Sequence, residues 1–150
     1  MFGGIVGVVT NSIFHLKRGE IYTINGSKFF TFGGAYSIDK ARRKSFISWW
    51  PQEEPNKVEM DWGLSNLEKH NNEVDFVVTH TAPIEVVKEM SEYRLNFYDD
   101  YYTMKMDACS KYLSEVKNRI KFKKWFFGHF HEDGELSNNF FPVYRHIVKV

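Results

Sequence analysis

Two closely spaced histidines follow an apolar run in the last quarter of the chain. His129 and His131 stand in the segment Gly128-His129-Phe130-His131, directly after Trp125-Phe126-Phe127. Side chains at positions i and i+2 of a strand point to the same face, so these two imidazoles can converge on one centre. Neutral imidazole is the commonest protein ligand of transition metals. The spacing therefore indicates a metal site at the end of a strand.

A third histidine, His80, follows a second apolar run, Phe76–Thr79. Ligands of open α/β sheets bind at the carboxyl ends of the strands, so we expect His80 to meet His129 and His131 at one sheet edge. Two kinds of site are compatible with this set. One is a pair of divalent metals joined by a carboxylate, and the other is a single zinc ion held by three imidazoles.

The elements that must position these histidines follow an α/β pattern. The segment Asn25-Gly26 favours a type I′ turn and predicts a hairpin. Apolar periodicity predicts the other elements, and a long irregular loop is expected between Gly33 and Pro55. The predicted strands are 5–9, 13–16, 20–24, 27–32, 74–79 and 122–127, with one or two closing strands in 140–150; the predicted helices are 58–69, 83–93 and 99–120.

Length and composition bound the class of protein. The chain of 150 residues fits one domain, spanning 1–150. Its net charge of +1 argues against a broad electrostatic attraction to nucleic acid or anionic membranes, so we expect neither as a partner. The single cysteine, Cys109, excludes an intrachain disulfide. No stretch is long enough to span a bilayer and no targeting signal is evident, so we expect a cytoplasmic protein.

Two histidine-bearing segments resemble a known family when they are taken together. Thr79-His80-Thr81-Ala82-Pro83 and the later Trp125–His131 segment resemble the last two metal-binding motifs of the calcineurin-like metallophosphoesterases. Further segments are similar to the bacterial and phage branch of that family, and the likeness covers about the later two-thirds of the family's domain. These segments are His15–Tyr22, Phe32–Asp39 and Trp49–Pro51.

This resemblance implies a fold, a metal site and an activity. The fold would be an incomplete calcineurin-like α/β/β/α sandwich with mixed sheets and flanking helices. His80 and His129 would bind one divalent metal and His131 a second, with Mn, Fe or Zn as candidates. The activity would be phosphate-ester hydrolysis by metal-activated water.

Three earlier motifs of that family have no counterpart in this chain. They supply the bridging Asp, an Asn ligand and the His that stabilises the transition state, so we assign no catalytic residue. The resemblance then implies the C-terminal part of a phosphoesterase, inactive alone and dependent on a complementary N-terminal segment. Uncovered strand edges would also favour self-association.

Other residues have both a functional and a structural interpretation. Arg18, Arg42 and Arg43 are candidates for binding a phosphate-bearing substrate, because guanidinium groups bind phosphate bidentately. Trp49 and Trp50 can stack on a base or sugar, although packing of the loop is the simpler expectation. The alternative function is a non-catalytic interaction module on a degenerate phosphoesterase scaffold.

Overall fold

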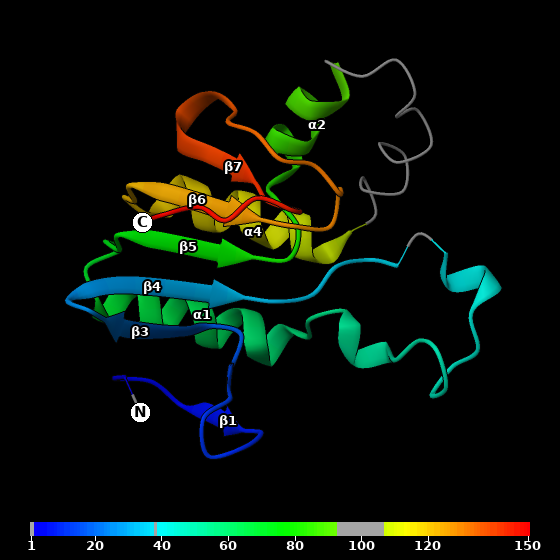
Figure 1. Cartoon of the computed structure of the whole chain (residues 1–150), viewed down its shortest axis with the longest axis horizontal. Helices are drawn as coiled ribbons and strands as arrows, with labels where there is room; N and C mark the ends of the chain where they lie inside the picture. The colour runs from blue at the N-terminus through cyan, green and yellow to red at the C-terminus, as the bar shows by residue number, and fades with distance from the viewer. Residues whose placement is uncertain (1, 38, 93–106) are drawn as a thin grey trace.

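The computed structural model describes residues 2–37, 39–92 and 107–150 and has a mixed α/β architecture (Figure 1). Its main sheet has five strands in the order β3-β4-β5-β6-β7. The strands are β3 (Glu20–Ile24), β4 (Ser27–Phe32), β5 (Phe76–Thr79), β6 (Lys124–Phe127) and β7 (Phe140–Pro142). A separate two-stranded sheet pairs β1 (Val6–Val8) with β2 (Phe14–Leu16).

Helices connect the strands of the main sheet. The α-helices are α1 (Lys57–Lys69), α2 (Ile84–Glu92) and α4 (Ala108–Arg119), and short 3₁₀-helices are η1 (Lys40–Arg42), η2 (Pro51–Glu53) and η3 (Ser137–Asn139). Among the described residues no helix has the length and apolar character needed to cross a bilayer.

The predicted hairpin is confirmed. Asn25 and Gly26 have φ angles of 49° and 80°, as a type I′ turn requires, and β3 pairs antiparallel with β4. From β4 onward every pairing is parallel: β4 with β5, β5 with β6 and β6 with β7. The carboxyl ends of these four strands therefore share one edge of the sheet.

Most predicted elements lie where the sequence indicated, with shifted ends. The predicted strands 74–79 and 122–127 are confirmed but begin two residues later, and the region 140–150 contributes one short strand, β7. The loop between β4 and α1 contains the two turns η1 and η2 and extends away from the sheet in Figure 1. Residues 99–106 of the predicted helix 99–120, and Tyr93 of the helix before it, lie outside the described residues.

The hydrophobic core lies between the sheet and its helices. Phe30, Val77 and Trp125 of three adjacent strands belong to one buried cluster with Leu113 and Val116 of α4, and all five are fully buried. Figure 1 shows α1 and α4 behind the sheet. Burial of such large apolar side chains is the main stabilising term for a chain of this size.

The opposite face of the sheet carries a row of phenylalanines. The Phe29 and Phe76 ring centroids lie 4.8 Å apart, and those of Phe126 and Phe141 lie 5.5 Å apart. The C-terminal segment crosses this face in Figure 1, but Val78 remains 41% exposed. The described helices thus cover one face of the sheet, and the chain's own C-terminal segment partly covers the other.

Gly63 explains how closely α1 approaches its neighbours. A glycine inside a helix costs about 1 kcal/mol relative to alanine. A Cβ at Gly63 would collide with the Tyr112 hydroxyl of α4 and would lie 3.3 Å from the Cα of Gly19. The Tyr112 hydroxyl is buried and has no hydrogen-bond partner among the described residues. Close packing of α1 therefore requires a glycine here.

We predict that Gly63→Ala lowers the free energy of unfolding by about 1–3 kcal/mol, because overpacking outweighs the gain in helix propensity. Tyr112→Phe removes the colliding hydroxyl, so the double variant Gly63→Ala/Tyr112→Phe should recover part of this loss. Urea unfolding of the four proteins measures both effects. Unchanged stability of Gly63→Ala would contradict this packing.

Candidate functional site

His80 and His129 meet at the carboxyl edge of the sheet. Thr79 of β5 pairs with Phe127 of β6, so the residues that follow these strands emerge side by side. The Gly128 N–H donates to the His80 carbonyl oxygen at 3.1 Å. His80 Nε2 and His129 Nδ1 lie 3.1 Å apart. The predicted convergence of these two imidazoles is confirmed.

The route by which His129 and His131 reach the site differs from the prediction. Strand β6 ends at Phe127, and the two histidines have left-handed φ angles of 71° and 55°, so they do not share a strand face. The Phe130 N–H donates to the Gly128 carbonyl at 2.9 Å, which closes a tight three-residue turn around His129. The Phe130 side chain is buried in the core and holds this strained turn in place.

Partial desolvation in the cavity favours the neutral form of both facing imidazoles, although His80 is exposed and His129 is half-buried. Desolvation, together with the nearby His80 and His131, lowers the pKa of His129 to about 4. Desolvation also lowers the pKa of His80, although the nearby Glu53 and Asp107 charges oppose this shift. Metal ions bind only neutral imidazole, so both rings have a lone pair available at neutral pH.

The separation of the two nitrogens suits a shared metal ion. Zn–N bonds of about 2.0–2.1 Å at a tetrahedral angle place two ligand nitrogens about 3.3 Å apart. The observed 3.1 Å between His80 Nε2 and His129 Nδ1, which is also a hydrogen-bond distance, is close to this value. Among the described residues, however, no group of three or more His, Cys, Asp or Glu side chains is arranged to hold a metal. The pair therefore fits two coordination positions and leaves the others to further ligands.

His131 lines the same cavity but its ring faces another partner. The imidazole stacks on Tyr144, with ring centroids 4.7 Å apart. Asp133 fixes the backbone of this C-terminal segment, because its carboxylate accepts hydrogen bonds from the N–H groups of Tyr144, Arg145 and His146. These hydrogen bonds also lower the pKa of Asp133. The structure thus brings two of the three predicted ligands into direct contact and places the third at the cavity wall.

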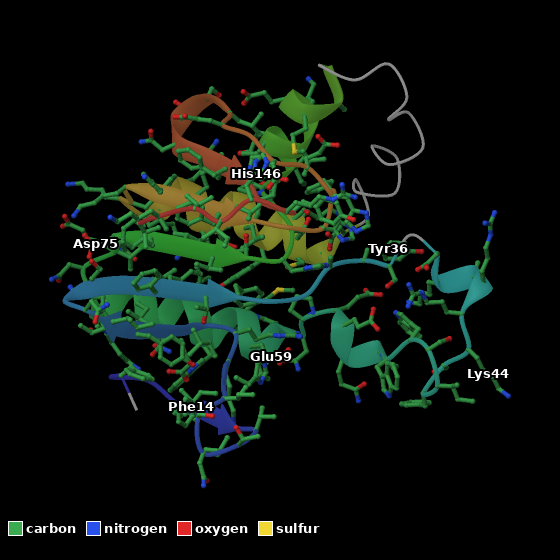
Figure 2. The ribbon with its side chains drawn as sticks, viewed as in Figure 1. Phe14, Tyr36, Lys44, Glu59, Asp75 and His146 are labelled. Atoms are coloured by element: carbon green, nitrogen blue, oxygen red, sulfur yellow. The ribbon has the colours of Figure 1, made fainter. Side chains whose placement is uncertain are left out.

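The three histidines line a cavity of about 760 Å³ at the carboxyl edge of the sheet. The opposite wall comes from the segment after β4 and from the loop around η2. Arg18 and Arg43 line this cavity, whereas Arg42, the third predicted substrate-binding residue, is not part of the lining. Figure 2 shows Tyr36 near the body and Lys44 far out along the loop.

Both cavity arginines already have partners. Arg18 pairs with Glu59 at 3.2 Å and donates to the Gln52 carbonyl oxygen at 2.8 Å. Arg43 pairs with Asp39 at 2.6 Å. Arg18 therefore joins the η2 loop to α1, which makes it a positioning residue for the cavity wall.

Three cavity residues were missed by sequence reasoning. His15 of β2 adds a fourth imidazole to the lining, and Asp39 and Glu53 add two carboxylates. Glu53 is held by the Ser37 hydroxyl, which donates to it at 2.8 Å. His15 and Asp39 fall in the segments that carry the family resemblance, which was a usable signal. Glu53 had none, because its place depends on how the loop folds back.

A buried chain of hydrogen bonds fixes the end of β5. The Trp125 indole N–H donates to Thr79 Oγ1 at 2.9 Å, and the Thr79 hydroxyl donates to the Thr81 carbonyl at 2.6 Å. The Thr81 and Ser110 hydroxyls lie 3.3 Å apart, and the Ser110 hydroxyl donates to Asp107 at 3.0 Å. These hydrogen bonds connect Thr79 and Thr81, the two neighbours of His80, to β6 and to the start of α4. Satisfied buried networks of this kind specify one conformation.

Comparisons with known proteins add no family. No protein-family model, no curated protein and no solved structure matches the chain. The functional argument therefore rests on the residues and their geometry.

The position of the η2 loop yields a prediction. Gly34 has a φ of 111°, and a Cβ there would lie 2.5 Å from the Glu53 carbonyl oxygen. Gly34→Ala should therefore detach the loop from the segment after β4, because it adds both backbone strain and a backbone clash. We expect amide exchange at Glu53 and Glu54 to become about tenfold faster, as measured by NMR.

The neighbouring glycine provides the control. A Cβ at Gly33 would meet nothing within 4 Å, so Gly33→Ala should leave the exchange rates of the loop unchanged. Equal rates in the Gly34→Ala and Gly33→Ala proteins would show that the loop is not held by this contact.

Proposed function

We propose that this chain is the metal-binding, C-terminal part of a calcineurin-like metallophosphoesterase. The single observation that carries the proposal is the pair His80 Nε2 and His129 Nδ1, 3.1 Å apart at the carboxyl ends of adjacent parallel strands. The sequence resemblance assigns the same two residues to one metal. The mixed α/β sheet with flanking helices is compatible with one half of that family's sandwich.

His80 and His129 would hold the first divalent ion, with Mn, Fe and Zn as candidates, and His131 would reach a second. Such a cation polarises a phosphoryl oxygen and lowers the pKa of a coordinated water. The chain's own residues would bind this cation and orient the two imidazoles that hold it. The strained turn around His129 and the buried network behind Thr79 hold the two imidazoles in a ready arrangement.

We expect little hydrolysis from this chain alone. Two facing imidazoles supply fewer ligands than a catalytic metal site requires. Among the described residues, the carboxylates that line the cavity are Asp39 and Glu53. Electrostatic stabilisation of the phosphoryl transition state requires the positive charge of a completely coordinated metal centre. Activity would then depend on further ligands from a complementary segment or from a second copy.

We predict that Zn²⁺ binds to the wild-type chain and that His80→Ala and His129→Ala each weaken this binding by at least tenfold, because each removes one ligand of a facing pair. His131→Ala should have a smaller effect, since its ring stacks on Tyr144. Calorimetric titration with Zn²⁺ measures all three affinities.

His70→Ala is the matched control, because His70 caps the C-terminal end of α1 and is not part of the cavity lining. Its Zn²⁺ affinity should equal that of the wild type. If His80→Ala, His129→Ala and His70→Ala all bind Zn²⁺ alike, the metal role of the pair is refuted and a non-catalytic binding module becomes the better account.

A further inference from the structure

We propose that the cavity binds a mononucleotide, a phosphate monoester with a flat aromatic base, and that the Trp50 indole is the platform on which the base stacks. This inference rests on the proposed function, because the phosphate would be placed at the His80 and His129 pair. It adds a substrate class and a specificity-determining residue. The supporting observations come from the opposite wall of the cavity.

Two consecutive tryptophans of the loop have opposite environments. Trp49 is only 9% exposed, and the Lys40 ammonium lies 4.1 Å from its ring centroid. Trp50 is 44% exposed and lines the cavity that holds the histidines. Trp49 therefore anchors the loop by packing, which was the simpler expectation, whereas the exposed Trp50 is part of the cavity wall.

Local hydrogen bonds order the backbone at Trp50 even though its side chain is exposed. The Trp50 N–H donates to Glu53 Oε1 at 3.2 Å, and its carbonyl accepts from the Glu53 N–H at 2.9 Å. Pro51 then restricts the chain at the start of η2. An aromatic ring on a fixed backbone loses little conformational entropy when a ligand stacks on it.

Comparison with Trp62 shows what is unusual about Trp50. Trp62 of α1 is 42% exposed, but its indole N–H donates to Glu20 at 2.9 Å and the Lys69 ammonium lies 4.7 Å from its ring. Among the described residues, no aromatic ring or cation packs against the Trp50 indole. An exposed, unstacked indole inside a concave site is typical of a surface that receives another aromatic ring.

The size of the cavity agrees with a mononucleotide. A volume of about 760 Å³ lies within the usual range for small-molecule sites, about 300–1,000 Å³. Arg18 and Arg43 are paired with Glu59 and Asp39, and the lining also carries Glu53, so the charged side chains named in the lining leave no excess positive charge for a phosphate. Recognition therefore divides in two: the phosphate depends on a cation at the histidine pair, and the base depends on Trp50.

The test measures binding of AMP, adenosine and ribose 5-phosphate to the Zn²⁺-loaded chain by calorimetry. We expect AMP to bind about tenfold more tightly than ribose 5-phosphate, because base stacking on an aromatic ring adds this much or more. Trp50→Ala should remove that difference, and Trp50→Phe should keep part of it. Trp62→Phe, at the other exposed tryptophan, should leave the AMP affinity unchanged. Circular dichroism checks that each variant is folded.

The outcomes separate this inference from the proposed function. Equal affinities for AMP and ribose 5-phosphate, a preference that persists in Trp50→Ala, or no AMP binding at millimolar concentration would overturn the stacking role. AMP and adenosine binding alike, with both lost in Trp50→Ala, would support the base site while refuting the metal-held phosphate.

Discussion

The parallel pairing of β5 with β6 is the constraint on which the candidate site depends. Its register places Thr79 opposite Phe127, so the next residues of both strands reach the same point of the sheet edge. A shift of one residue would turn the buried side chains of a strand to its other face. Trp125 is fully buried and its indole N–H binds Thr79, so the core itself specifies this register. The β5–β6 register therefore determines both the packing of the core and the meeting of His80 with His129.

The second wall of the cavity depends on contacts of a different kind. The loop between β4 and α1 has little regular structure, and it is held by Arg18, by the close approach of Gly34 to Glu53 and by the buried Trp49. The polar contacts of this loop are made by exposed or half-buried side chains, so this wall can open at lower free energy than the sheet. The cavity thus combines a rigid side that holds the imidazoles with a less stable side that presents Trp50.

Sequence patterns predicted the parts of the molecule that follow from local rules. Asn25-Gly26 predicted the hairpin, and apolar runs predicted β5 and β6 and hence the meeting of His80 with His129. The left-handed turn at His129 was not predictable, because bulky residues rarely adopt a positive φ and the buried Phe130 is what stabilises it. Glu53 entered the cavity through loop contacts distant in sequence, which no periodicity reveals. The stacking of His131 on Tyr144 likewise depends on where Asp133 fixes the C-terminal segment.

X-ray absorption at the zinc edge of the Zn²⁺-loaded chain tests the central claim most directly, because it counts the imidazoles bound to the metal. The account predicts two imidazole nitrogens at about 2.0–2.1 Å, falling to one in His80→Ala and to one in His129→Ala. A spectrum without imidazole scattering, or one that neither substitution changes, would contradict it.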